Sequence, residues 1–154
     1  MRKSALVLVL ALLIPAAASA RNGDRGDGTF VVKSAVGQLT LNAKGSVIGK
    51  LDRGEITVQD LTPTASDEIQ ILGYDRKPVV RPDGATTYRG DKMRIRVVGG
   101  GYLVTVTGSG INLSSVGKGT VVGTAISEGL FSTDGSPFRA APAAAYAGSF
   151  GQQQ

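Results

Sequence analysis

Two neighbouring runs, Lys92-Met-Arg-Ile-Arg-Val-Val98 and Tyr102-Leu-Val-Thr-Val-Thr107, decide the fold class. In the first run, apolar residues alternate with charged residues. A period of two is typical of a strand with one buried face and one face in water. Between the runs lies Gly99-Gly100-Gly101. Glycine accepts positive φ angles, so this triplet favours a tight hairpin connection. The stretch therefore predicts two antiparallel strands.

Short β-branched runs of this kind continue from residue 29 to about residue 131, separated by Gly, Pro, Asn and Asp. The expected strands are 29–33, 38–42, 46–50, 55–59, 68–72, 86–89, 92–98, 102–107, 111–114, 120–125 and 129–132. Gly108-Ser-Gly110 and Gly117-Lys-Gly119 predict further hairpin turns. About ten short strands predict an all-β fold, a single antiparallel β-sandwich or small barrel. A β-solenoid is the alternative, because glycine recurs often, although no coil repeat of fixed length is evident.

Residues 1–20 have the pattern of a secretory signal peptide. Arg2 and Lys3 precede an apolar stretch, Ala5 to Ile14, and Ala18-Ser-Ala20 forms a small-residue cleavage site. Cleavage after Ala20 predicts a secreted, periplasmic or cell-surface protein. The apolar stretch is shorter than the roughly 20 residues of a membrane span, and no later stretch reaches that length. We expect no membrane span after cleavage.

The rest of the chain divides into three parts. Residues 21–28 (RNGDRGDG) are polar and glycine-rich and are expected to form a flexible leader. Residues 29–138 form the expected β-rich domain. Residues 139–154 (RAAPAAAYAGSFGQQQ) consist largely of Ala, Gly and Gln, and this composition predicts a flexible, disordered C-terminal tail.

The composition excludes several kinds of chemistry. The 154 residues include 22 Gly but no His, Cys or Trp. There is consequently no imidazole base, no thiolate nucleophile, no disulfide and no His- or Cys-ligated metal. We expect a non-enzymatic domain with neither metal nor cofactor. It would act as a structural or surface-interaction protein, with a polymer or a protein of the cell envelope as its partner.

Charge is the remaining chemical signal. Residues 52–75 hold six acidic residues and one basic residue, whereas residues 76–96 hold seven basic residues and two acidic residues. Strand alternation places Lys92, Arg94 and Arg96 on one exposed face, with Arg89 nearby. One interpretation is cross-strand ion pairing with acidic neighbours such as Glu55 and Glu68. The other is an anion-binding stripe for a polysaccharide or another acidic polymer.

A nucleic-acid partner is not expected. Aromatic residues make up only 5% of the chain, and nucleic-acid binding usually combines aromatic stacking with a strongly basic surface. Removal of residues 1–20 lowers the formal net charge from +5 to +3, because Arg2 and Lys3 leave with them. This is a modest charge for a domain of this size.

The tripeptide Arg-Gly-Asp occurs twice, at Arg25-Gly26-Asp27 and at Arg89-Gly90-Asp91. It resembles the motif that integrins recognise, and the second copy is expected at a hairpin tip. The alternative interpretation is that Gly-Asp is simply a common turn pair. Arg89, Gly90 and Asp91 are therefore an adhesion-like candidate site.

Other motifs give weaker signals. A carboxylate pair among Glu55, Glu68 and Glu128 is the remote basis for a glycoside hydrolase. Ser115-Val-Gly-Lys118 matches the Ser–Lys motif of penicillin-binding enzymes but lacks its partner motifs. The oxygen-bearing residues of 21–28 have a spacing that suits calcium, but they lack the glutamate that ends an EF-hand loop.

Overall fold

The computed structural model describes residues 27–64, 66–141 and 144–151. This part of the chain contains six strands and no helix. The strands are β1 (Gly28–Asp60), β2 (Glu68–Leu72), β3 (Val79–Val80), β4 (Thr86–Thr133), β5 (Arg139–Ala140) and β6 (Ala144–Phe150). Every recorded strand pairing is antiparallel. The predicted all-β, antiparallel fold class is thereby confirmed.

Several expectations concern residues outside the described ranges. These are the signal peptide with its cleavage after Ala20, nearly all of the leader, and most of the first Arg-Gly-Asp copy and of the calcium-like grouping. The last residue of the expected leader, Gly28, already begins strand β1. Among the described residues, no helix has the length and apolar character needed to cross a membrane.

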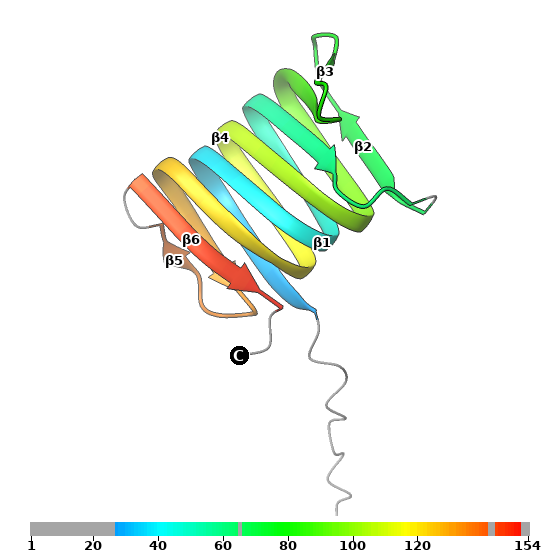
Figure 1. Cartoon of the computed structure of the whole chain (residues 1–154). Helices are drawn as coiled ribbons and strands as arrows, with labels where there is room; N and C mark the ends of the chain where they lie inside the picture. The colour runs from blue at the N-terminus through cyan, green and yellow to red at the C-terminus, as the bar shows by residue number, and fades with distance from the viewer. Residues whose placement is uncertain (1–26, 65, 142–143, 152–154) are drawn as a thin grey trace, which may run out of the picture.

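Strands β1 and β4 are long and wind around a common axis (Figure 1). Each pairs with successive coils of the other. Val116 of β4 pairs with both Thr29 and Ser46 of β1, a step of 17 residues (29 to 46). Leu39 of β1 pairs with both Val106 and Gly123 of β4, again a step of 17 residues (106 to 123). Coils of the two strands therefore alternate along the axis and run in opposite directions.

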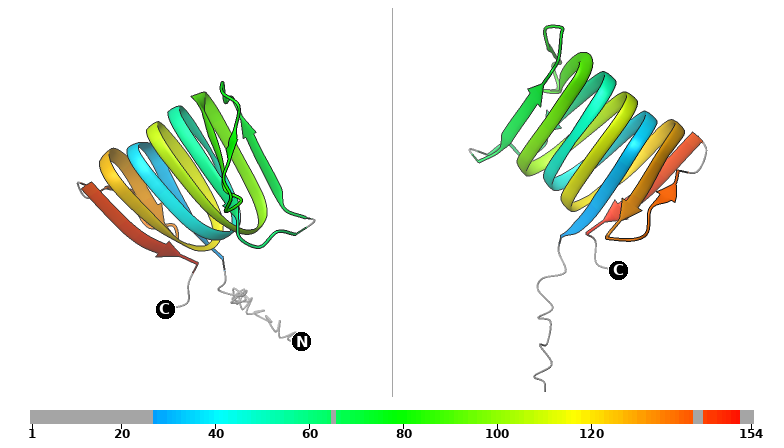
Figure 2. Two further views of the ribbon diagram at one scale, coloured as in Figure 1. Left: turned by 45° about the horizontal axis from the view of Figure 1, so that its top comes forward. Right: turned by 180° about the vertical axis from the view of Figure 1, so that it is seen from behind.

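The coil is flattened, so its straight segments form two facing layers in a sandwich-like arrangement (Figure 2). The outer surface of one layer, here called the basic face, is formed by residues 29–33, 46–50, 68–72, 94–98, 112–116 and 130–133. The outer surface of the other layer, here called the threonine face, is formed by residues 38–42, 55–59, 86–89, 103–107, 120–124 and 145–150. The antiparallel pairing does not show the β-solenoid alternative, although the 17-residue step of β1 is a fixed coil length that was not evident in the sequence.

The core lies between these two layers. Met93, Ile95 and Val97 are buried, as the alternation predicts, and so are Ile56 and Val58. Large side chains such as Tyr102, Leu39 and Leu41 are fully buried beside them. Burial of apolar surface is the main favourable term in folding, so this two-layer core supplies the cohesion that a chain without disulfides requires.

The glycine clusters do not form hairpin turns. Gly99–Gly101, Gly108–Gly110 and Gly117–Gly119 all lie inside the continuous strand β4, so that prediction was wrong. Glycine instead stands where the coil passes from one layer to the other. A Cβ atom on Gly54 would lie 2.0 Å from the carbonyl oxygen of Thr107, and the φ angle of Gly54 is +145°. Only a residue without a side chain fits such a close backbone approach.

The C-terminal segment also differs from its expectation. Residues 139–140 and 144–150 are strands β5 and β6, which extend the two layers at one end of the coil (Figure 2). Phe150 is 1% exposed, and its ring stacks on Phe30 at a centroid distance of 6.1 Å. Tyr146 stacks on Phe131 at 4.7 Å. Two aromatic residues spaced four apart thus dock a segment whose overall composition suggested disorder.

Candidate functional site

The basic strand has the predicted alternation. Arg94 and Arg96 are exposed on the basic face, while the apolar residues between them are buried. Lys92 departs from the pattern. Its φ angle is +56°, which marks the place where β4 bends between the two layers. Lys92 is exposed at this bend, and therefore it does not continue the row of Arg94 and Arg96.

Two of the four candidate cations have carboxylate partners. Arg96 lies 2.7 Å from Glu68 of β2, and Arg89 lies 2.8 Å from Glu55 of β1. All four side chains are substantially exposed, and such surface pairs contribute about 0–1 kcal/mol each. For Arg89 and Arg96, the cross-strand interpretation of the charge pattern is therefore the one that the geometry supports.

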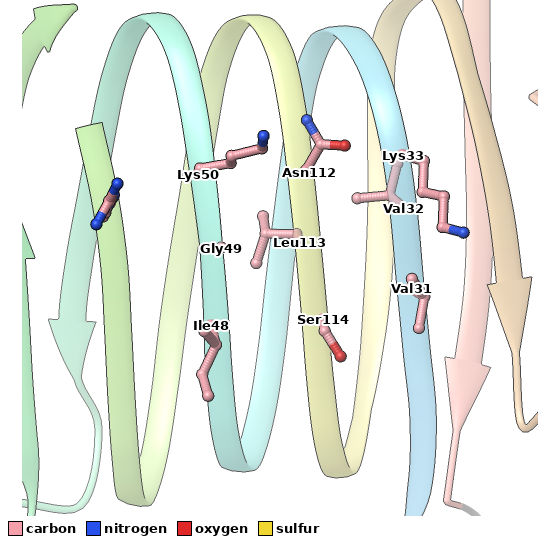
Figure 3. A pocket seen from close by; sticks show the side chains of 10 residues that line it. Val31, Val32, Lys33, Ile48, Gly49, Lys50, Asn112, Leu113 and Ser114 are labelled. Carbon is pink, nitrogen blue, oxygen red and sulfur yellow. The ribbon is translucent and has the colours of Figure 1, made fainter. Parts of the chain in front are cut away.

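Arg94 has a different environment. Within the described part of the chain, no carboxylate lies within ion-pair distance of Arg94. Its direct neighbour across the strand pairing is Lys50, and Lys50 in turn pairs with Asn112. Lys33 follows on the next coil of β1. Figure 3 shows that Lys50, Asn112 and Lys33 lie on successive segments around a groove, with the ammonium of Lys33 directed away from the other two.

The groove occupies about 510 Å³ on the basic face. Val31 and Ile48 lie below the cationic margin, and Leu113 lies between them (Figure 3). Ile48 is 52% exposed, so its side chain is accessible to a ligand in the groove. Among the described residues, no Asp or Glu lines the groove. The site thus combines an apolar floor with three cations on one margin.

Specific contacts hold the margin in place. The Nζ atom of Lys33 lies 4.2 Å from the ring centroid of Phe138, a favourable cation–π distance. Asn112 donates through Nδ2 to the carbonyl of Gly110 at 2.9 Å and accepts at Oδ1 from the amide of Ser34 at 3.2 Å. The amide of Asn112 is thereby restrained beside the groove, whereas the ammonium of Lys33 is held over Phe138, a residue that does not line the groove.

The second Arg-Gly-Asp copy lies inside β4 and not at a hairpin tip, which corrects that expectation. Both of its charges are paired, Arg89 with Glu55 and Asp91 with Arg53 at 3.0 Å. The hydrogen bond from Arg53 lowers the pKa of Asp91. The amide of Asp75 donates to the carbonyl of Arg89 at 3.1 Å, so the 73–75 segment packs against the tripeptide. This is not the freely projecting loop that the adhesion hypothesis requires.

The carboxylates considered for hydrolysis do not converge. Glu55 lies on the threonine face, paired with Arg89, and Glu68 lies on the basic face, paired with Arg96. Glu128 lies opposite Val36, where the coil bends. Ser115 of the Ser–Lys motif is buried in the core, whereas Lys118 is exposed. Among the described residues, no group of three or more acidic side chains is placed to hold a metal ion.

Sequence reasoning missed Lys33 and Lys50. Lys33 is the last residue of its expected strand and faces the same side of the sheet as Val31, two residues earlier. Lys50 has the same relation to Ile48. The alternation of apolar and polar residues in those strands could have indicated that the two lysine side chains point outward. The register that puts Lys50 beside Arg94, and both lysines on the layer that carries Arg94, depends on the coiling of β1 and β4, which local pattern does not specify.

Comparisons with known proteins offer no further guidance, because no family model, no curated protein and no solved structure matches this chain. The geometry of the groove is therefore the basis for assigning a function.

Proposed function

We propose that this protein is an exported, non-enzymatic β-domain that binds an acidic polysaccharide through the groove on its basic face. The observation that carries the proposal is the row of Arg94, Lys50 and Lys33 above an apolar floor, with no carboxylate among the lining residues. Paired cations elsewhere on the surface are already neutralised, whereas this row presents net positive charge to solvent.

The spacing of the row favours a polymer over a single small anion. Neighbouring strands lie about 4.8 Å apart. Arg94 and Lys50 are on adjacent segments, and one further segment, carrying Asn112, separates Lys50 from Lys33. The backbones that carry the outermost cations are therefore roughly 14 Å apart. A chain with repeated charges can contact all three cations at once, and its multiple contacts add to the affinity.

The apolar floor favours a carbohydrate polymer over a polyphosphate. Val31 and Ile48 offer apolar contact directly below the cations, whereas Leu113 is 3% exposed and belongs to the core. Sugar rings have apolar C–H faces as well as polar edges, so a uronate can place its carboxylate on the margin and its ring on the floor. A polyphosphate has no apolar surface for this floor, and burial of apolar area contributes roughly 25 cal/mol per Å².

Retention on immobilised polymers tests the proposal. We expect retention on alginate, a polyuronate, and none on uncharged dextran. Arg94→Glu and Lys50→Glu should each abolish retention in physiological salt, because each replaces an attraction with a repulsion. Lys44→Glu is the matched control, because Lys44 is an exposed lysine that does not line the groove. Equal retention of all four proteins would refute the proposal, as would equal binding to dextran.

Structural or surface interaction without a specific polymer is the second candidate function. The ion pairs of Arg89 and Arg96 favour this candidate, because these two of the four candidate cations already pair with carboxylates of neighbouring strands. In that case no acidic polymer is retained, and the groove is covered by a protein partner.

Export is part of either proposal, and it predicts a mature N-terminus at Arg21. N-terminal sequencing of the protein from its native source tests it.

A further inference from the structure

The threonine face differs chemically from the basic face. Its outward positions carry Thr40, Thr57, Thr105, Thr107, Thr120 and Thr124, half of the twelve threonines of the chain. Threonine is a favourable strand residue in general, and that preference alone would place it on both faces. Among the strand segments that form the basic face, the outward positions of β1 carry only Thr29. The concentration of threonine on one face therefore calls for a separate explanation.

The threonines form ranks that cross the strands. Thr40 pairs with Thr105, and Thr105 pairs with Thr57 on the next coil of β1. The hydroxyls of Thr40 and Thr105 lie 3.1 Å apart, and those of Thr57 and Thr87 lie 2.8 Å apart. Threonine is also stiff at χ1 because of its β-branch. These hydroxyl and methyl groups are consequently held in fixed positions.

A second rank repeats the pattern two residues further along the strands. Thr107 pairs with Gln38, and Gln38 pairs with Thr124. Neighbours within a rank are about 4.8 Å apart, and neighbouring ranks are about 6.7 Å apart. The first rank holds consecutive threonines and continues to Val122, and the second rank has Gln38 between two threonines. The face is thus an array of neutral hydroxyl, methyl and amide groups whose spacing is set by the strands.

The array carries almost no charge. Glu55 and Arg89 stand at its margin and neutralise one another across 2.8 Å. The coil also keeps successive segments in register, so the outer surface of this layer is continuous (Figure 2). A charged group keeps a tightly held hydration shell that disturbs any regular water layer. A stiff, uncharged array of hydroxyls and methyls instead offers evenly spaced places for ordered water.

We propose that the threonine face binds ice. The ligand is a crystal surface of water, whose oxygen atoms repeat regularly in two dimensions and match an array of neutral hydroxyls and methyls. The rigid ranks of Thr40, Thr57 and Thr105 form the centre of the site. This activity uses the opposite layer from the polysaccharide groove, so the two proposals stand independently.

Thermal hysteresis and inhibition of ice recrystallisation by the purified protein test this proposal. The wild-type protein should arrest ice growth below the melting point. Thr105→Lys, at the centre of the array, should reduce the thermal hysteresis to the level measured for serum albumin, the reference protein. Ser114→Lys introduces the same charge at an exposed position of the basic face and should keep the wild-type hysteresis. Circular dichroism confirms that each variant is folded, and Thr105→Val serves as a milder variant if Thr105→Lys does not fold.

Three results would overturn the proposal. One is a folded wild-type protein without hysteresis. Another is a folded Thr105→Lys or Thr105→Val variant that retains the full effect. The third is equal loss in Ser114→Lys, which would indicate an effect of charge alone. Lys50→Glu should remove retention on alginate and leave hysteresis unchanged, so failure of one proposal is distinguishable from failure of the other.

Discussion

Gly54 of β1 and Gly108 of β4 lie directly opposite one another where the coil bends from one layer to the other. A Cβ atom on Gly108 would lie 2.0 Å from the carbonyl oxygen of Arg53, and the φ angle of Gly108 is +147°. The same contact exists in reverse, between a Cβ atom on Gly54 and the carbonyl of Thr107. The bend is thus built from two backbones in mutual contact.

Gly108→Ala should destabilise the protein by about 2–5 kcal/mol, because it adds a backbone clash to the cost of a positive φ angle. Urea unfolding measures the change in the free energy of unfolding. Gly84→Ala is the control, since Gly84 also has a positive φ angle, +80°, but has no atom within 4 Å of the added methyl. Equal losses in the two variants would contradict the close-approach explanation.

Phe150→Ala should destabilise the protein by about 3–5 kcal/mol, the usual cost of truncating a buried phenylalanine. Its ring is buried against Phe30, and this contact docks strand β6 on the end of the coil. Phe138→Ala, at a position that is 41% exposed, should cost less than half as much. If Phe150→Ala leaves the urea midpoint unchanged, β6 is not part of the cooperative fold.

Ser115→Ala should stabilise the protein by roughly 1 kcal/mol. The Oγ atom of Ser115 is buried and has no hydrogen-bond partner among the described residues, and such an unsatisfied group costs about 1–3 kcal/mol. Ser132→Ala is the matched variant, and it should change the free energy of unfolding in the opposite direction. The hydroxyl of Ser132 donates to the carbonyl of Ser136, so its removal should lower the free energy of unfolding. Destabilisation by Ser115→Ala would show that its hydroxyl has a partner.

Acid should weaken the loop that Asp67 organises. The side chain of Thr64 and the amide of Gly100 donate to this carboxylate at 2.7 and 2.8 Å, and both lower its pKa. Because the folded pKa lies below the unfolded value of about 3.9, the stabilisation is present above that pH and is lost as the pH falls through the folded pKa.

Asp67→Asn removes this titration. The free energy of unfolding of the variant should therefore fall less steeply than that of the wild type between about pH 5 and pH 2. Urea unfolding across this range is the measurement. Identical slopes for the two proteins would mean that Asp67 has the same pKa in the folded and unfolded states.

Local pattern was sufficient to locate most of the straight strand segments. Residues 38–42 and 55–59, for example, lie in β1 with the alternating burial expected of them, and β2 has the predicted bounds. The pattern did not show that one strand continues through several segments. That continuity depends on glycines 28, 37, 45 and 54 of β1 meeting glycines 90, 99, 108 and 117 of β4 at the bends. Their spacing of eight or nine residues was present in the sequence but was attributed to turns.

The candidate site was predictable only in part. Arg94 was recognised because its own strand alternates clearly. Lys33 and Lys50 were missed because their proximity to Arg94 depends on the pairing of coils that are far apart in sequence. The charge pattern offered ion pairing with Glu55 and Glu68 as one of two interpretations. The register was needed to show that Arg96 pairs with Glu68 and that Arg94 has no such partner among the described residues.

A residue-level map of binding by NMR tests directly whether the groove on the basic face binds an acidic polysaccharide. A uronate oligomer is titrated into ¹⁵N-labelled protein, and the shift of each backbone amide is followed. We expect the largest shifts at residues 31–33, 48–50, 94 and 112–114, which surround the groove. In Arg94→Glu, binding should be weakened at least about tenfold, a loss of roughly 1.4 kcal/mol. Shifts confined to other cations, such as Lys44 and Lys118, or no shifts at all, would contradict the proposal.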